Sequence, residues 1–281
     1  MKQIPPLDAA AVLKRYGLRA DKRLGQNFLQ DQSALEAILS AAQIEPTDTV
    51  LEIGPGLGSL TRYLAASARQ VVAVELDGDL IPPLQAVLAP YQNVRVIHGN
   101  ILDLSPKEII AENDYLVAAN VPYYITSAVI RHLLAQSRNR ESDPRPRRIA
   151  LTIQKEVAER ICAAPGDMSL LALSVQVYGE PSIAARIPAE AFFPAPKVDS
   201  AVLTVDIFPA PQIKPELINT FFRLIKAGFS QKRKTLRNSL SSGLHISPNA
   251  AVEMLAKADI NPQRRAETLS MEEWRLLCEI K

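Results

Sequence analysis

The sequence predicts an α/β protein in which a doubly wound parallel sheet is followed by a small helical domain. Between positions 48 and 153, short β-branched runs alternate with segments of helical period, which is typical of parallel strands joined by helices. Beyond about Pro209 the strand character fades and helical patterns follow one another. The 281 residues, with 47% hydrophobic content, suffice for these two parts. We therefore expect a first domain at 1–208 and a second at 209–281.

The elements of the first domain are expected in a regular order. Asp31 can cap a helix that runs to Ala42. The expected strands are Thr49–Ile53, Gln70–Glu75, Val94–His98, Tyr115–Asn120 and Arg148–Ile153. Apolar residues at helical spacing predict helices after the first two strands, at Leu60, Leu64 and Ala68 and at Leu80, Leu84 and Leu88. Two prolines and many charges predict an exposed loop at 137–148.

Helical patterns continue in the second domain. We expect helices at 217–229, 232–240, 249–257 and 271–280. Together with an N-terminal helical segment before the sheet, these elements complete the predicted fold.

Composition excludes several classes of protein. The 32 basic and 30 acidic residues nearly balance, so net charge alone implies no partner. Cys162 and Cys278 lie far apart and show no metal-ligand spacing, so we expect neither a disulfide nor a metal site. No apolar run approaches the roughly 20 residues that span a bilayer. We expect a cytoplasmic protein that does not bind membranes and is a monomer.

A glycine-rich turn after the first expected strand predicts a cofactor site. Glu52–Gly58 places Gly54 and Gly56 between that strand and a helix, where glycine allows a sharp turn and a close approach to a ligand. Glu75 ends the next strand about 20 residues later, where a carboxylate can accept hydrogen bonds from both ribose hydroxyls of an adenosine. Asn100 follows the third strand and can meet the adenine ring. Nicotinamide cofactors and S-adenosylmethionine both fit this pattern.

The run after the fourth expected strand points to one chemistry. An aromatic amino group is a poor nucleophile because its lone pair is delocalised into the ring. The side-chain oxygen of Asn120 and the backbone carbonyl of Val121 can each accept one amino hydrogen and aim that lone pair at a sulfonium methyl group. Pro122 constrains the turn, and Tyr123 can stack on a flipped base, an interaction worth about 1 to 3 kcal/mol. Hydride transfer needs none of these groups.

In these motifs the chain resembles the small-subunit ribosomal RNA adenine dimethyltransferase family. The matching segments are Lys22–Leu29, Glu52–Gly58, Glu75–Asp77, Asn120–Tyr123, Phe192 with Pro194–Val202, and Gln231–Leu240. The resemblance implies a Rossmann-like class I methyltransferase domain that binds S-adenosylmethionine, followed by a helical RNA-binding domain. It implies N6-dimethylation of two adjacent adenosines near the 3′ end of the small-subunit RNA during ribosome biogenesis. The assembling 30S subunit is then the partner.

The same resemblance implies further site residues. Asn27 and Leu29 are expected to contact the cofactor, Phe192 to sandwich the target base, and Lys22 and Arg23 to close over both substrates. Four positions depart from the family's usual residues: Asn100 replaces Asp, Leu24 replaces Phe, Val121 replaces Leu, and Tyr124 replaces Asn. None removes a proposed catalytic group, because Val121 acts through its backbone.

Two basic clusters are candidates for RNA contact. Between Lys226 and Ser241 the chain has five basic residues and no acidic one: Lys226, Lys232, Arg233, Lys234 and Arg237. The second cluster lies in the expected loop and contains Arg138, Arg140, Arg145, Arg147 and Arg148. Either cluster can instead be an ordinary solvated surface.

Three other functions remain open at this point. A large-subunit RNA adenine methyltransferase that confers antibiotic resistance would share Asn120 to Tyr123. A non-enzymatic assembly factor could use the same fold, although the intact Asn120, Pro122 and Tyr123 argue against it. A dehydrogenase would bind NAD instead of S-adenosylmethionine.

Overall fold

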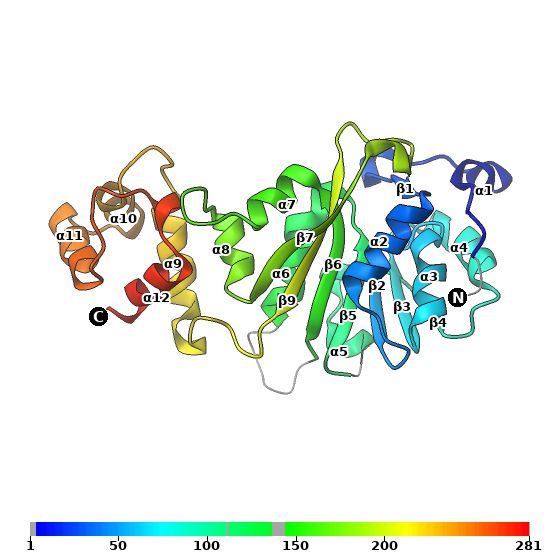
Figure 1. Cartoon of the computed structure of the whole chain (residues 1–281), viewed down its shortest axis with the longest axis horizontal. Helices are drawn as coiled ribbons and strands as arrows, with labels where there is room; N and C mark the ends of the chain where they lie inside the picture. The colour runs from blue at the N-terminus through cyan, green and yellow to red at the C-terminus, as the bar shows by residue number, and fades with distance from the viewer. Residues whose placement is uncertain (1–3, 111, 137–143, 281) are drawn as a thin grey trace. The chain divides into compact units, whose positions relative to one another are not determined.

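A computed structural model describes residues 4–110, 112–136 and 144–280, which fall into two compact units (Figure 1). The first unit comprises Met1–Ala158 and Ser182–Ile207, and the second comprises Glu159–Pro181 and Phe208–Lys281. The chain passes from the first unit to the second at Phe208, next to the position where the sequence pattern changes from strands to helices. The structure adds 159–181 to the second unit, whereas the sequence pattern predicts this segment in the first domain.

A seven-stranded sheet forms the centre of the fold, with strand order β4-β3-β2-β5-β6-β9-β7. Its bounds are β2 Thr49–Ile53, β3 Gln70–Glu75, β4 Val94–His98, β5 Tyr115–Asn120, β6 Pro146–Gln154, β7 Gly179–Ile187 and β9 Ser200–Ile207. The strands from β4 to β6 are parallel, as predicted. Strand β9 runs antiparallel to β6, with Leu151 opposite Leu203, so the sheet is mixed. The apolar run at 201–203 was the signal in the sequence for this unpredicted strand.

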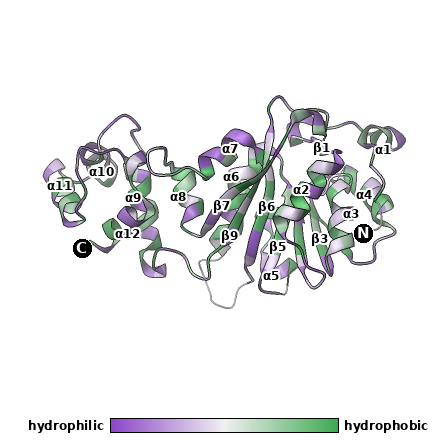
Figure 2. Ribbon diagram, in the orientation of Figure 1, coloured by the Kyte–Doolittle hydropathy of each residue, from purple (hydrophilic) through white to green (hydrophobic). Residues whose placement is uncertain are grey.

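Burial on both faces explains the parallel part of the sheet. Every residue of β2 is buried, as are all but one of β5, which is what parallel strands covered by helices require. Figure 2 shows hydrophobic colouring along these central strands. Helices α2 (Gln32–Ala42) and α3 (Ser59–Ser67) share one core cluster with Val50, Leu116 and Ala150.

Five other helices belong wholly or partly to the first unit as far as the structure describes it. They are α1 Ala9–Arg15, α4 Ile81–Leu88, α5 Pro106–Ile109, α6 Thr126–Gln136 and α7 Lys155–Ile161, the last of which extends into the second unit. The predicted cap is confirmed at α2, where Asp31 accepts a hydrogen bond from the Ala34 backbone N–H at 2.8 Å. Helix α1 was not predicted individually. Its Leu13 packs with Phe28, Leu57 and Leu80 beside the glycine-rich turn.

Two short strands tie the N-terminal segment to the region before β9. Strand β1 (Phe28–Leu29) pairs antiparallel with β8 (Phe192–Phe193), so that Leu29 lies opposite Phe192. The preceding 3-10 turn is Lys22–Leu24, and its N-terminus is capped by the Asp21 carboxylate. We call residues 21–29 the strap.

The second unit is helical. Its helices are α8 Leu170–Gln176, α9 Ile218–Gly228, α10 Leu236–Leu244, α11 Pro248–Lys257 and α12 Met271–Glu279. Trp274 is fully buried, and a Cβ at Gly228 would come within 2.5 Å of its ring, so α9 and α12 can approach only because residue 228 is glycine.

The helix expected at 232–240 begins later than predicted. Helix α10 starts at Leu236, because the backbone N–H groups of Leu236 and Arg237 donate to the carbonyls of Arg264 and Pro262. Residues 231–234 form a turn instead, closed by a 3.0 Å bond from the Lys234 N–H to the Gln231 carbonyl. We call residues 231–234 the basic turn.

The loop expected at 137–148 ends earlier than predicted. Strand β6 already begins at Pro146, and positions 137–143 lie outside the described residues. Across the described residues, no helix is both long and apolar enough to span a membrane.

Candidate active site

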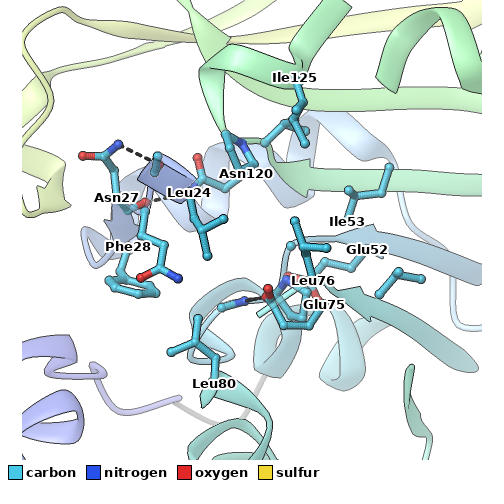
Figure 3. Close-up of a pocket in the computed structure, with 18 of the residues that line it drawn as sticks. Leu24, Asn27, Phe28, Glu52, Ile53, Glu75, Leu76, Leu80, Asn120 and Ile125 are labelled. Atoms are coloured by element: carbon cyan, nitrogen blue, oxygen red, sulfur yellow. Dashed lines mark hydrogen bonds between the residues drawn. The ribbon is translucent and has the colours of Figure 1, made fainter. Parts of the chain in front are cut away.

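A cleft opens at the carboxyl ends of the parallel strands, where the strand order reverses between β2 and β5. Such switch points are the usual ligand sites of open α/β sheets. The cleft encloses about 990 Å³, including its solvent-open mouth. Four segments line it: the strap, the glycine-rich turn with the end of β3, residues 99–101 after β4, and residues 120–125 after β5. Figure 3 shows labelled residues of three of these segments around one space: Leu24 and Asn27 of the strap, Glu52 and Glu75, and Asn120.

The glycine-rich turn is bonded to the end of β3. The Glu75 carboxylate accepts hydrogen bonds from the backbone N–H groups of Gly56 and Asp77, each at 2.9 Å. Gly56 adopts a φ of 59°, and a Cβ there would lie 3.0 Å from the Phe28 ring, so both conformation and space require glycine. Gly54, with a φ of 67°, also lines the cleft. Burial raises the pKa of Glu75, and the two backbone bonds oppose that rise.

Asn120 is held in one orientation by the strap. Its amide nitrogen donates to the Asn27 carbonyl at 2.9 Å, and the Asn27 amide in turn donates to the Gly25 carbonyl at 3.0 Å (Figure 3). A carbonyl can only accept, so the Asn120 nitrogen must face Asn27, which leaves the Asn120 oxygen for another partner. Gln26 forms a second bond between the strap and the wall of the cleft, since its side-chain amide donates to the Asp77 carboxylate at 2.6 Å.

Tyr123 is anchored through its hydroxyl. The hydroxyl lies 2.7 Å from that of Ser200, a fully buried residue at the start of β9. Burial raises the pKa of Tyr123, so the phenol stays protonated at neutral pH. Val121 and Pro122, the residues between Asn120 and Tyr123, also line the cleft. Beside them the exposed ring of Tyr124 lies against Gly25, where a Cβ would come within 3.2 Å of it.

Asn100 lines the cleft but also caps a turn. Its side-chain oxygen accepts from the Leu102 N–H at 3.1 Å, and its nitrogen donates to Asp103 at 3.0 Å. A carbonyl-type oxygen has two lone pairs, so one stays available for a ligand.

The two adjacent phenylalanines of β8 differ in burial. Leu29 and Phe192 form a strand pair, and both are buried in the core cluster with Ile38. Leu29 lines the cleft, whereas Phe192 is only 5% exposed and is not part of the described lining. Its ring is therefore packed in the core in this structure, and its stacking on a base stays a prediction. Side chains alternate along a strand, so the outward ring is that of Phe193, which is 39% exposed.

The predicted RNA-contacting residues lie in three different settings. Lys22 and Arg23 lie on the strap, where the largely exposed Arg23 pairs with Asp21 at 2.9 Å. Lys232, Arg233 and Lys234 are exposed in the basic turn. Arg237 is half-buried in α10, and its Nε is buried with no hydrogen-bond partner among the described residues.

Two members of the second basic cluster, Arg147 and Arg148, are engaged in structural interactions. Arg147 forms two 2.8 Å bonds to the buried Asp48 and lowers the pKa of that carboxyl. Arg148 pairs with Asp206 and donates to the Ala41 carbonyl at 2.7 Å. Arg138 and Arg140 lie outside the described residues.

Sequence reasoning missed two residues that hold the walls of the cleft, Ser200 and Gln26. Ser200 and Gln26 lie 77 and 51 positions from the residues that they bond, so no local pattern could pair them. Ser200 does lie inside the matched run 194–202, which was an available signal. Among the described residues, no group of three or more His, Cys, Asp or Glu side chains could hold a metal ion.

Comparisons with known proteins show which family the chain resembles along its length. The model of the family "Ribosomal RNA adenine dimethylase" matches residues 17–281. The chain is 48% identical over 271 residues to the ribosomal RNA small subunit methyltransferase A of Dehalococcoides mccartyi strain 195, covering 96% of this chain and 91% of that protein. It is 41% identical over 283 residues to the protein of that name from Alkaliphilus metalliredigens, covering 98% and 96%.

Solved structures share the fold along most of the chain. A dimethyladenosine transferase from Plasmodium falciparum superposes with a TM-score of 0.73 at 25% identity, covering 89% of this chain and 95% of that one. The 23S rRNA methyltransferase ErmE superposes with a TM-score of 0.70 at 28% identity, covering 90% and 98%. The predicted methyltransferase fold with a helical C-terminal part is thus confirmed. The chain belongs to the ribosomal RNA adenine dimethylase family.

Proposed function

We propose that this enzyme uses S-adenosylmethionine to dimethylate the N6 atoms of two adjacent adenosines near the 3′ end of small-subunit ribosomal RNA, within the assembling 30S subunit. The observation that carries the proposal is the fixed orientation of Asn120, which leaves its amide oxygen in the cleft as a hydrogen-bond acceptor. An acceptor there suits an exocyclic amino group.

The residues of the cleft fit S-adenosylmethionine. Backbone at Gly54 and Gly56 allows close approach, Glu75 offers an acceptor for ribose hydroxyls, and Asn100 offers an amide to the adenine. Asn27 and Leu29 of the strap close the opposite wall. When bound, this cofactor supplies an electrophilic methyl group on a cationic sulfur.

The chain's own residues orient the amino group. The Asn120 oxygen and the Val121 carbonyl each accept one N6 hydrogen, Pro122 constrains the turn, and the Tyr123 ring stacks on the flipped base. The methylated nitrogen is more acidic than the neutral amine and can lose its proton to water. We therefore assign no His or Asp as a general base.

The C-terminal helical domain is proposed to bind RNA. Lys232, Arg233 and Lys234 present exposed cations from the basic turn, Arg237 follows them, and Lys22 and Arg23 add positive charge on the strap beside the cleft. Such interactions with phosphates supply affinity without reading sequence. The cytoplasmic location and the monomeric state expected from the sequence stay predictions.

A large-subunit substrate is the second candidate, because ErmE shares the fold. The small subunit is favoured by relatives of that name at 41% and 48% identity, against 28% for ErmE.

One experiment separates these substrates. Purified small and large subunits that lack the modification would each be incubated with the enzyme and methyl-labelled S-adenosylmethionine. The proposal expects label in the small subunit alone. Label confined to the large subunit would select the second candidate, and no label in either would contradict both.

A further inference from the structure

Tyr124 presents an exposed aromatic ring at the mouth of the cleft. Its side chain lines the cleft and is 58% exposed, the highest value among the large hydrophobic side chains that are exposed in the described part of the chain. Single exposed hydrophobic residues are common, so the position of the ring carries more weight than its exposure. Tyr124 directly follows Tyr123, the residue proposed to stack on the flipped base.

Two elements hold the Tyr124 ring in place. Tyr124 lies in the 3-10 turn Tyr123–Ile125, which runs directly into α6 and is closed by a 3.2 Å bond from the Ile125 N–H to the Pro122 carbonyl. On the strap, a Cβ at Gly25 would lie 3.2 and 3.4 Å from the ring atoms Cδ1 and Cε1. Glycine at this position therefore lets the strap lie against the ring. A ring that is already held in this way loses little conformational freedom when a base stacks on it.

The two adjacent tyrosines have different surroundings. Tyr123 is half-buried and its hydroxyl lies 2.7 Å from that of Ser200, whereas most of the Tyr124 side chain is open to solvent. On the proposed function, Tyr123 stacks on the flipped adenosine inside the cleft. The second target adenosine is covalently joined to the first, so it must lie at the mouth of the cleft, where the next ring along the chain is exposed.

The strap adds positive charge beside this ring. Lys22 and Arg23 are exposed in the 3-10 turn that ends directly before Gly25. Cations that follow the phosphates, combined with aromatic rings on which bases stack, are the usual means of binding single-stranded nucleic acid. A segment of RNA that leads a base into the cleft is single-stranded at that point. The chemistry at the mouth of the cleft therefore suits a nucleotide.

We propose that Tyr124 is a stacking platform for the nucleotide next to the flipped adenosine. Flipping the target base removes a stacking partner from its neighbour, and the Tyr124 ring replaces that partner. The inference rests on the proposed function and deepens it, because it assigns a residue to the second of the two adjacent adenosines. Many members of the family that the chain resembles have Asn at this position, so the platform is not part of the shared catalytic run.

Small subunits with a synthetic 3′ segment in their RNA test the platform. In this segment one adenosine of the target pair is replaced by an abasic nucleotide, which keeps the backbone and removes the base. The kcat/KM for methylation of the remaining adenosine is measured with labelled S-adenosylmethionine, for each of the two possible replacements. With wild-type enzyme, loss of the neighbouring base should lower kcat/KM roughly 5- to 100-fold for at least one of them. With Tyr124→Ala, kcat/KM on the intact pair should already be lowered by a similar factor, and removal of that base should cause no further loss.

Three further variants separate stacking from packing. Tyr124→Phe keeps the planar ring and should keep the dependence on the neighbouring base. Tyr124→Leu keeps an apolar side chain against Gly25 without a planar ring, so it should behave like Tyr124→Ala. Tyr16→Ala is the matched control, because it removes an exposed tyrosine ring that is not part of the described cleft lining, and it should behave like wild type.

Several results would overturn the inference. If wild-type enzyme were indifferent to the missing base, or if Tyr124→Ala lost as much activity as wild type when the base is removed, the ring and the base would act independently. Retained base dependence in Tyr124→Leu, or weakened S-adenosylmethionine binding by Tyr124→Ala in calorimetry, would assign the ring to the packing of the strap instead. A wild-type enzyme that methylated no small subunit, intact or abasic, would contradict the proposed function itself.

Discussion

The cofactor cleft of the first unit and the basic turn of the second differ in how their polar side chains are held. In the cleft, Asn120 and Tyr123 are each fixed by a bond to a residue far away in the sequence. In the basic turn, Lys232 to Lys234 are exposed. The difference suits the two tasks, because methyl transfer requires a fixed direction whereas phosphate binding requires charge.

The largest expected effect is on the free energy of unfolding, at the two phenylalanines of β8, which differ in burial. Phe192→Ala should lower the free energy of unfolding by about 3 to 5 kcal/mol, because it empties a buried site. Phe193→Ala should leave stability within roughly 1 kcal/mol, because its ring is partly exposed. Chemical denaturation measures both. Equal losses of unfolding free energy would mean that the two rings do not differ in their contribution to packing.

Asn120→Ala should lower the kcat for methyl transfer by roughly 10²- to 10³-fold or more, because it removes an acceptor fixed in the cleft. Calorimetry should find cofactor affinity changed only a few-fold. Full activity in this variant would show that the held amide has no part in the chemistry.

Glu75→Ala should weaken cofactor binding by about 1 to 3 kcal/mol, since it removes charge-assisted ribose bonds and two bonds to the backbone. The dissociation constant for S-adenosylmethionine reports this directly. An unchanged constant removes Glu75 from the site.

Particular residues show what the sequence could and could not predict. Strands β2 to β5 were predicted at their observed bounds, because β2, β3 and β5 are buried, largely apolar runs and β4 is rich in β-branched residues. Strand β7 alternates between exposed and half-buried positions with a proline inside, which is a weaker signal. The start of α10 depends on carbonyls of Pro262 and Arg264, which no local pattern reveals.

The residues of the site also divide into those that the sequence predicted and those that it did not. Gly56, Glu75 and Asn120 were predicted because each lies at a strand end, and strand ends share one edge of the sheet. The burial of Phe192 was not predicted, since only the register with Leu29 decides which of two adjacent rings is buried. Ser200 was missed because its partner is 77 residues away.

Replacing Lys232, Arg233 and Lys234 with Gln tests whether the basic turn binds phosphates. Binding to small subunits should weaken, and the salt dependence should flatten by roughly 0.7 to 0.9 of a logarithmic slope unit for each phosphate that is no longer neutralised. Cofactor affinity should stay unchanged. The control replaces Arg147 and Arg148, whose ion pairs predict reduced stability instead of a changed slope. The opposite result would move the RNA-binding face to that cluster.

The smallest effect concerns the hydroxyl that anchors Tyr123. Tyr123→Ala should cost about 1 to 3 kcal/mol of base stacking. Tyr123→Phe and Ser200→Ala should each cost about 1 kcal/mol in kcat/KM, because either change breaks the same bond. In a double-mutant cycle, Ser200→Ala should add nothing to Tyr123→Phe. Additive losses would mean that Ser200 does not act through the ring.

The central claim is tested most directly by identifying the methylated nucleosides themselves. Small subunits that lack the modification would be incubated with the enzyme and S-adenosylmethionine, and their RNA digested and mapped by mass spectrometry. The account predicts N6,N6-dimethyladenosine at two adjacent positions near the 3′ end, with none formed by Asn120→Ala. Methylation of another base or another atom, or equal product from the variant, would contradict it.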